Sequence, residues 1–262
     1  MAITITELRA RKERGERFAM LTAYDALTAK LLDEAGIPIL LVGDSLAQVV
    51  LGYDSTLPVT IDEMLHHTRA VARGATNALI VGDMPFGSYQ ASIDDAMTNA
   101  FRFLKEAGAH AVKLEGAHLD LVRRLTDAGV PVMGHLGLTP QSVNQFGGYK
   151  VQGRTDEAAN RILLDAKALE ESGAFAIVLE CVPADLATRI TASLSIPTIG
   201  IGAGAGCDAQ VLVIQDLLGL TPTTPKFVKR YAEVGSTLVD AAQAFITEVA
   251  AGTYPGPEHS YK

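Results

Sequence analysis

The sequence contains no tryptophan and only two cysteines, Cys181 and Cys207. Two cysteines without a CxxC partner cannot form a disulfide framework or a zinc site, so we interpret both as structural. Long apolar runs are also missing, because none approaches the roughly 18 residues that a membrane helix needs. The segment 1–20 is charged and lacks the apolar core of a signal peptide. These absences predict a soluble, cytoplasmic protein with no membrane partner.

An excess of positive charge is absent as well. The formal net charge is −8, from 22 Lys and Arg against 30 Asp and Glu, which argues against nucleic acid and against an acidic membrane surface as partners. What the chain does have is 262 residues that are 48% hydrophobic, enough for a sizeable core. We find no linker, and therefore expect a single domain over residues 1–262 with a short N-terminal helical extension.

One unit recurs along the chain: a helical segment ends in a small residue and Gly, a short run of Val, Ile and Leu follows, and a polar residue closes it. The closing residues are Asp44, Asp83, Glu115, His135 and Glu180. Glycine suits a helix C-terminus, where a positive φ costs it little. Short apolar runs without alternation are typical of parallel strands covered on both faces. Thr60, Ser92 and the amphipathic stretch from Asp156 indicate helix starts between the runs.

Further apolar runs near residues 17–25 and 210–216 bring the expected number of strands to about eight. Alternating β and α segments over this length predict a (β/α)8 TIM barrel of the α/β class. Between Ile201 and Val211 there is no room for an ordinary helix, so one crossover should be short or distorted. A doubly wound open sheet is the alternative architecture.

Functional groups of a TIM barrel gather at the carboxyl ends of its strands. The polar residues at or near those ends are Asp44, Asp83, Lys113, Glu115, His135 and Glu180. Any one of them could simply return a strand to water. Three carboxylates, a lysine and a histidine at matching positions instead predict one functional mouth.

Asp44, Asp83 and Glu115 are hard oxygen ligands without a Cys/His cluster, which favours Mg²⁺. Pairing of each acid with a basic neighbour, or helix capping, is the alternative. Without a cation, three acids in one mouth would repel one another. Lys113 and Glu115 are two residues apart and share a strand face. The lysine could bind a substrate carboxylate, form a Schiff base, or make a salt bridge at the rim; with a metal present we favour carboxylate binding.

His135 precedes a long polar segment, residues 137–154, of the kind that is usually functional or mobile. The histidine could donate to a substrate oxygen or could be structural. The glycines of Gly200–Gly206 suggest a phosphate site, but they do not fit the G-x-G-x-x-G pattern, and tight turns explain them better.

Several longer segments resemble one family closely. They are VGDSLAQVVLGYDSTLPVT, DMPFGSY, VKLEG, GHLGLTPQSVNQFGGYKVQGR, VLECVP, IGIGAG and PKFVK, in order from Phe18 to the YPGPEHSY segment. On them the chain resembles the ketopantoate hydroxymethyltransferase (3-methyl-2-oxobutanoate hydroxymethyltransferase) family. The resemblance implies a (β/α)8 barrel of the phosphoenolpyruvate/pyruvate superfamily type and a homodecamer of two pentameric rings.

The resemblance also implies a reaction. A hydroxymethyl group passes from 5,10-methylenetetrahydrofolate to 3-methyl-2-oxobutanoate through a Mg²⁺-stabilised enolate. The product is 2-dehydropantoate, in the first committed step of pantothenate (vitamin B5, coenzyme A) biosynthesis. The implied metal residues are Asp44, Asp83 and Glu115. The implied substrate-binding residues are Asp44, Ser45, Asp83, Lys113 and His135. The implied proton acceptor is Glu180, whose apolar approach, Phe175–Leu179, would make its carboxylate a better base.

Four places depart from the family pattern: Ala47-Gln48, Ala117, Ala205 and Ala209. They remove no chemical group but could alter the fit of loops beside the metal. Two rival functions stay open. One is a superfamily enzyme that forms or cleaves C–C bonds or rearranges phosphonates, which would not depend on folate. The other is a metal-binding or ring-forming scaffold without turnover.

Overall fold

The computed structural model describes residues 2–262. The chain forms two compact units, the first ending at Val213 and the second running from Ile214 to Lys262. The single domain expected over residues 1–262 stays a prediction.

The first unit is a closed barrel of parallel strands that follow one another in chain order. Its strands are β1 (Phe18–Thr22), β2 (Ile39–Val42), β3 (Leu79–Asp83), β4 (Ala111–Glu115), β5 (Val132–Gly137), β6 (Ala176–Glu180), β7 (Thr198–Ile201) and β8 (Ala209–Leu212). The barrel closes where β1 pairs with β8, with Phe18 opposite Ala209. The predicted (β/α)8 barrel is therefore confirmed, and the open-sheet alternative is wrong.

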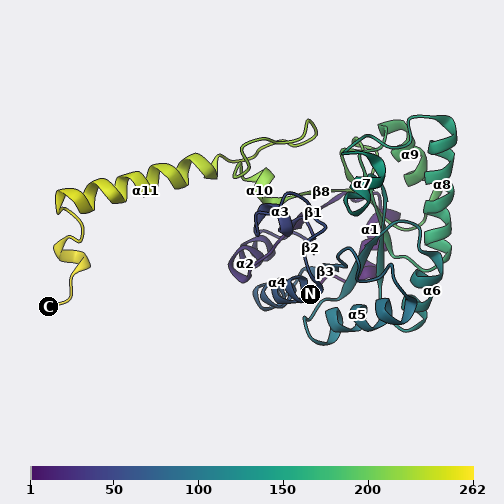
Figure 1. Cartoon of the computed structure of the whole chain (residues 1–262), viewed down its shortest axis with the longest axis horizontal. Helices are drawn as coiled ribbons and strands as arrows, with labels where there is room; N and C mark the ends of the chain where they lie inside the picture. The colour runs from purple at the N-terminus through teal and green to yellow at the C-terminus, as the bar shows by residue number, and fades with distance from the viewer. Residues whose placement is uncertain (1) are drawn as a thin grey trace. The chain divides into compact units, whose positions relative to one another are not determined.

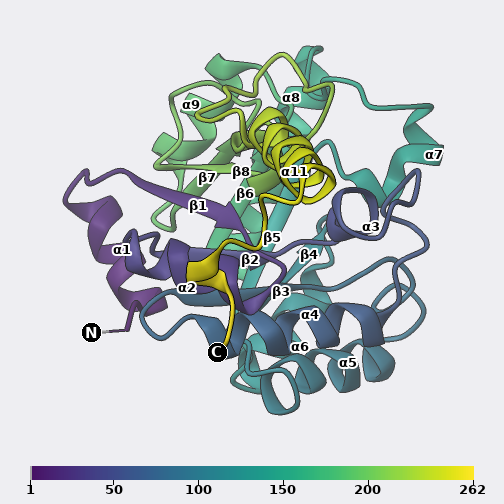
Figure 2. The same cartoon turned by 90° about the vertical axis from the view of Figure 1, so that its left-hand side faces the viewer.

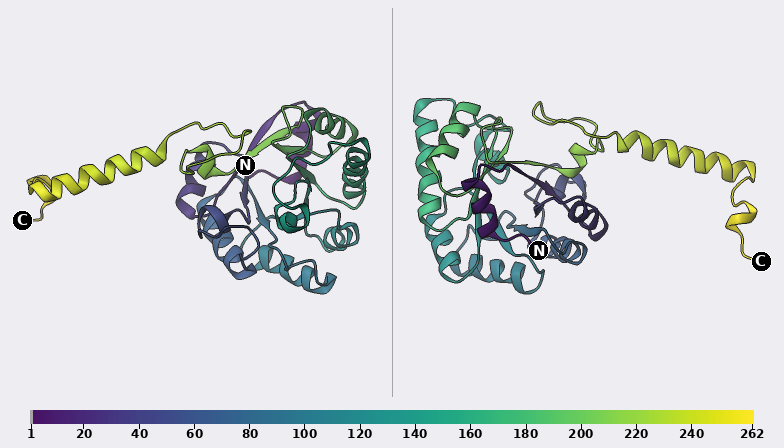
Figure 3. Two further views of the ribbon diagram at one scale, coloured as in Figure 1. Left: turned by 45° about the horizontal axis from the view of Figure 1, so that its top comes forward. Right: turned by 180° about the vertical axis from the view of Figure 1, so that it is seen from behind.

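Helices surround the strands of this unit (Figure 1; Figure 3, left). They are α1 (Ile5–Glu13), α2 (Ala26–Glu34), α3 (Leu46–Val49), α4 (Ile61–Gly74), α5 (Ile93–Lys105), α6 (Leu119–Asp127), α7 (Val143–Phe146), α8 (Asp156–Glu171) and α9 (Ala184–Ser193), with a 3-10 turn η1 (Pro140–Ser142). Thr60 begins α4 with a reciprocal capping box to Glu63, and the Ser92 side chain caps α5. Within the described chain, residues 202–208 link β7 to β8 without a helix, as the short interval predicted.

Apolar side chains close the amino-terminal end of the barrel. Leu8 of α1 is fully buried in a cluster with Met20, Ile39 and Met133 from inside the strands. Figure 2 shows α1 at the opposite end of the strands from α3 and α7. The Lys12 ammonium donates to the Asp208 carboxylate over 2.9 Å and to the Thr191 carbonyl over 2.9 Å. These contacts fix α1 as the floor of the barrel.

The second unit contains α10 (Ile214–Leu217), α11 (Val234–Ala251) and the 3-10 turn η2 (Pro257–His259). Helix α11 carries large apolar side chains on its surface, among them Leu238, Phe245 and Ile246. In the described part of the chain, no helix is both long and apolar enough to cross a membrane.

Candidate active site

The strands bring the predicted polar residues to one end of the barrel. Asp83 ends β3 opposite Lys113 of β4, Glu115 ends β4 opposite His135 of β5, and Glu180 ends β6. Asp44 follows β2 by two residues. Five of these side chains are buried: Asp44, Asp83, Lys113, Glu115 and His135. The Glu180 side chain keeps 17% of its surface exposed, so it is the acid of the group that a substrate could reach most easily.

Lys113 and two of the aspartates form one side of the site. The Lys113 ammonium lies 2.6 Å from Asp83 Oδ1, and the Asp44 backbone N–H donates to Asp83 Oδ2 over 3.1 Å. Burial and the charge of Asp83 hold the pKa of Asp44 well above its usual range. Burial also raises the pKa of Asp83, against the opposing charge of Lys113. Burial lowers the pKa of Lys113, but the surrounding carboxylates outweigh that effect and raise it, so the lysine is a cation.

His135 joins this group to Glu180. Its Nδ1 lies 3.5 Å from Glu115 Oε1, and its Nε2 lies 3.2 Å from Glu180 Oε2. Burial and the nearby Lys113 charge lower the pKa of His135, but the carboxylates of Glu115 and Glu180 outweigh them and raise it to about 9. For Glu115, burial raises the pKa, whereas His135 and Lys113 lower it with a net downward shift. At neutral pH the site therefore holds an imidazolium between two carboxylates.

Close backbone packing fixes the end of β6, where Glu180 stands. Gly137 ends β5 with φ 94°, and a Cβ there would collide with the Glu180 carbonyl oxygen. That carbonyl accepts a 2.8 Å hydrogen bond from the Leu138 N–H. Cys181, the next residue, has φ 48°, an uncommon left-handed conformation outside glycine. Burial raises the pKa of the Cys181 thiol to about 11, which makes it a poor nucleophile.

Ser45 stands at the same end, immediately after Asp44 and before α3. Its Oγ lies 2.8 Å from the hydroxyl of the buried Tyr24. Burial raises the pKa of Tyr24, so this tyrosine is a neutral phenol. The Tyr24 contact holds the Ser45 hydroxyl at this end of the barrel.

The carboxylates suit a hard cation held by few protein ligands. Among the described residues, no group of three or more His, Cys, Asp or Glu is gathered tightly enough to enclose a metal. Asp83 Oδ1 and Glu115 Oε1 are nonetheless buried, and within residues 2–262 neither has a well-directed hydrogen bond. Mg²⁺ commonly uses one or two carboxylates and completes its shell with water and substrate oxygens. The donor set therefore fits Mg²⁺ and does not fit an all-protein metal cage.

Two buried residues of the site, Gln141 and Tyr89, were not predicted. Gln141 lies in η1, and its Nε2 donates to Asp44 Oδ2 over 3.0 Å. The Tyr89 hydroxyl accepts a hydrogen bond from the Glu115 backbone N–H over 3.1 Å. Both residues lie in segments that the sequence marks as distinctive, DMPFGSY and GLTPQS. Within those segments, neither a charge nor a motif spacing distinguishes Tyr89 or Gln141 from its neighbours.

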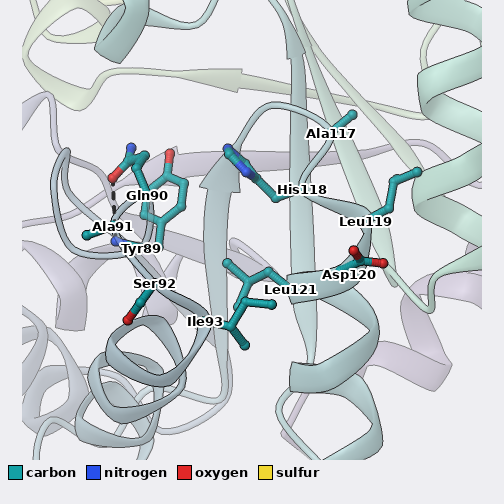
Figure 4. A pocket seen from close by; sticks show the side chains of 10 residues that line it. All are labelled: Tyr89, Gln90, Ala91, Ser92, Ile93, Ala117, His118, Leu119, Asp120 and Leu121. Carbon is teal, nitrogen blue, oxygen red and sulfur yellow. Dashed lines mark hydrogen bonds between the residues drawn. The ribbon is translucent and has the colours of Figure 1, made fainter.

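Tyr89 also lines a neighbouring cavity of about 530 Å³ between the loops that precede α5 and α6 (Figure 4). The cavity-lining residues are Tyr89, Gln90, Ala91, Ser92, Ile93, Ala117, His118, Leu119, Asp120 and Leu121. The Tyr89 and His118 rings meet edge to face with centroids 5.4 Å apart. The tyrosine thus separates this cavity from the carboxylates, with its hydroxyl on the site side.

A closed (β/α)8 barrel with acids, a lysine and a histidine at the carboxyl ends of its strands has the form of a TIM-barrel enzyme. Residues 2–257 match the family model described as ketopantoate hydroxymethyltransferase. A 3-methyl-2-oxobutanoate hydroxymethyltransferase from Syntrophus aciditrophicus (strain SB) is 62% identical over 262 residues, which cover 99% of this chain and 96% of the relative. The chain belongs to the ketopantoate hydroxymethyltransferase family.

Solved structures of lower sequence similarity share the fold. A phosphonopyruvate hydrolase in complex with oxalate and Mg²⁺ has a TM-score of 0.62 at 14% identity, covering 98% of this chain and 93% of its own. A 2,3-dimethylmalate lyase of the PEP mutase/isocitrate lyase superfamily has a TM-score of 0.62 at 16% identity, covering 98% and 90%. The barrel is thus of the type found in that superfamily, as expected.

Proposed function

We propose that the protein transfers a hydroxymethyl group from 5,10-methylenetetrahydrofolate to 3-methyl-2-oxobutanoate, giving 2-dehydropantoate and tetrahydrofolate in the first committed step of pantothenate biosynthesis. Its relatives carry the corresponding name. One observation carries the proposal: a lysine, three carboxyl groups and a histidine are buried together, and the more accessible Glu180 lies 3.2 Å from the histidine. This arrangement suits removal of a proton from a small keto acid.

Asp44, Asp83 and Glu115 would hold Mg²⁺. Burial raises the pKa of both aspartates, and a bound cation would lower it again by favouring the charged carboxylates. When bound, Mg²⁺ supplies positive charge that polarises the keto group and offsets the charge that develops as the C3 proton leaves. Asp83→Ala should therefore lose Mg²⁺ binding in calorimetry, and unchanged affinity would count against the ligand role.

Glu180 acts as the general base in this proposal. Its carboxylate accepts the proton from C3 of the keto acid, and the C3 carbanion then forms the new C–C bond to the methylene carbon carried by the folate. As this C–C bond forms, the bond from the methylene carbon to one folate nitrogen breaks, and that nitrogen takes up the proton. Water then replaces the second folate nitrogen, adding OH to the carbon and H to the nitrogen, which releases 2-dehydropantoate and tetrahydrofolate. The His135 imidazolium holds the Glu180 carboxylate in place through the 3.2 Å contact. A positioned base typically contributes a factor of about 10² to 10⁴ in rate.

Lys113, Ser45 and His135 serve the substrate. A buried lysine cation suits the carboxylate of the keto acid, because the pairing replaces water around both charges. Ser45 Oγ offers a hydrogen bond, and the His135 ring, whose nitrogens contact Glu115 and Glu180, adds positive charge near the substrate. The polar groups thus fix the acid end of the substrate and leave its isopropyl carbon toward Glu180.

Self-association is part of the proposal, as a homodecamer in the cytoplasm. Helix α11 supports an assembly, because Leu238, Ile246 and Val249 are at least 48% exposed on it. Clustered apolar side chains at a surface usually mark protein interfaces. Light scattering of the full chain tests this point. A monomer at micromolar concentration would contradict it.

The direct test of function is incubation of the protein with 3-methyl-2-oxobutanoate, 5,10-methylenetetrahydrofolate and Mg²⁺, with detection of 2-dehydropantoate. Formation of the product only when folate and metal are both present is expected. Turnover of a phosphonate or an oxaloacetate-like acid without folate would favour the rival superfamily chemistry. Metal binding without any turnover would favour the scaffold.

A further inference from the structure

Gln141 contacts two of the three proposed metal carboxylates at once. Its side-chain Nε2 donates to Asp44 Oδ2 over 3.0 Å, and its backbone N–H donates to Glu115 Oε2 over 3.0 Å. Asp44 follows β2 and Glu115 ends β4, and the contacts span 97 and 26 residues of sequence. Gln141 therefore links two acids, Asp44 and Glu115, that are far apart in the sequence.

The orientation of the Gln141 amide is fixed by its partners. Nε2 faces two acceptors, Asp44 Oδ2 and the Met84 carbonyl, each at 3.0 Å. Oε1 faces two donors, the Tyr89 hydroxyl at 2.7 Å and Gln90 Nε2 at 3.1 Å. Rotating the amide by half a turn would set oxygen against both acceptors. Every hydrogen-bonding position of the amide is used, so it has one stable orientation.

Tyr89 extends the same link. Its hydroxyl donates to Gln141 Oε1 and accepts from the Glu115 N–H over 3.1 Å. Glu115 is thus held through its main chain by Tyr89 and through its carboxylate by Gln141.

Gln141 has a rigid support. It is 5% exposed and follows Pro140, whose ring fixes φ at the start of η1. The segment is tied to β6 by the Leu138 N–H bond to the Glu180 carbonyl at 2.8 Å. The amide is therefore anchored to the strand that carries the proposed base.

We infer that Gln141 is a positioning residue, oriented by Tyr89, that sets the Asp44 and Glu115 carboxylates in place before a cation arrives. Each acid gives one oxygen to Gln141, and these bonds do not use Asp44 Oδ1 or Glu115 Oε1. Groups that orient metal ligands in this way typically contribute a factor of about 10 to 100 in metal affinity. The inference rests on the proposed Mg²⁺ role of these acids.

Gln141→Met tests it, because methionine keeps the length of the side chain and the backbone N–H bond to Glu115 but removes the amide. Calorimetric titration of the full chain with MgCl2, without substrates, should show binding weakened by about 10-fold to 100-fold. Gln210→Met is the matched control, since Gln210 is an exposed residue of β8 whose amide donates to the Gly204 carbonyl. The control should bind Mg²⁺ as the wild type does.

A second readout separates positioning from general damage. In the hydroxymethyl transfer assay, Gln141→Met should need more Mg²⁺ for half-maximal rate, and saturating Mg²⁺ should restore most of kcat. Tyr89→Phe keeps the ring and its packing and removes only the hydroxyl, so it should weaken Mg²⁺ binding in the same direction by a smaller factor. It serves as the test if Gln141→Met does not fold.

Unchanged Mg²⁺ affinity in both variants would overturn the inference, and so would a kcat loss in Gln141→Met that saturating Mg²⁺ does not restore. A wild-type protein that binds no Mg²⁺ would instead overturn the proposed metal role, and this inference with it. The two failures are distinguishable, because only the second is visible in the wild type.

Discussion

The two ends of the barrel are closed by opposite kinds of side chain. At the amino-terminal end, Leu8 of α1 packs with Met20 and Met133 in an apolar cluster. At the carboxyl end, Asp83, Lys113 and neighbouring polar groups are equally buried but in contact with one another. Apolar burial stabilises the fold, whereas a buried ionic cluster contributes little net stability against its desolvation cost. Stability therefore comes mainly from the floor, whereas the mouth carries the chemistry.

The largest effect is expected at the mouth, from Glu180→Gln. The amide cannot accept the C3 proton, so exchange of the C3 hydrogen of the keto acid with D₂O, followed by NMR, should slow by about 10² to 10⁴. The melting temperature should change little, and Mg²⁺ should still bind. Glu171→Gln, an exposed residue of α8, is the control. If Glu180→Gln exchanges the C3 hydrogen at the wild-type rate, Glu180 is not the general base.

At the floor the order of effects should reverse. Leu8→Ala removes a fully buried side chain and should lower the free energy of unfolding by about 2 to 5 kcal/mol in urea denaturation. The kcat of the folded fraction should stay near wild type, because Leu8 is at the end of the barrel away from the site. Leu27→Ala, at 69% exposure, should be nearly neutral. A large loss of kcat with little loss of stability would contradict the comparison.

A smaller effect is expected where the floor helix meets the strands. Asp208→Asn weakens the ionic bond from Lys12 and the bonds from the Thr198 N–H and hydroxyl. Hydrogen bonds to charged groups contribute about 1.5 to 3 kcal/mol, and we expect a loss of unfolding free energy in that range. Asp165→Asn breaks the more exposed pair with Arg161 and should cost less. Equal losses in the two variants would show that burial of the Lys12 pair adds nothing.

The smallest effect is expected in the pH dependence of the free energy of unfolding, at Asp33. Burial raises the pKa of Asp33, but the backbone N–H groups of Thr76, Ala78 and Asn77 outweigh it and lower the pKa overall. A lowered folded-state pKa gives stability that is present above the unfolded value and is lost as pH falls through the folded value. Asp33→Asn should therefore be less stable than wild type at pH 7, by about 1 kcal/mol or less because the half-buried carboxylate stays partly screened by water.

The Asp33→Asn difference in unfolding free energy should vanish as the pH falls below the usual carboxyl range. Asp127→Asn, at an exposed site on α6, should show no such convergence. A difference that grows toward acid pH would reverse the sign and contradict the argument. Guanidinium denaturation at several pH values provides the measurement.

The strands and their closing residues could be predicted from the sequence, since an unbroken apolar run that ends in a polar residue encodes both locally. Gln141 could not, because its role depends on where η1 lies relative to Asp44, 97 residues earlier. A buried glutamine also has no recognisable sequence pattern, because the role of its amide depends on the residues that it contacts in the folded chain. Gly137 is similar: its glycine requirement follows from the approach of the Glu180 carbonyl on another strand.

The Lys12–Asp208 bond can form only late in the synthesis of the chain. Its partners are 196 residues apart, and ribosomes add about 5 to 20 residues per second. Lys12 of the floor helix is therefore added roughly 10 to 40 s before Asp208, the residue that anchors it. During that interval Leu8 has no completed barrel to enter, and the apolar floor is open to other chains. The nascent protein is most exposed to aggregation at the end of the barrel that later becomes its most stable.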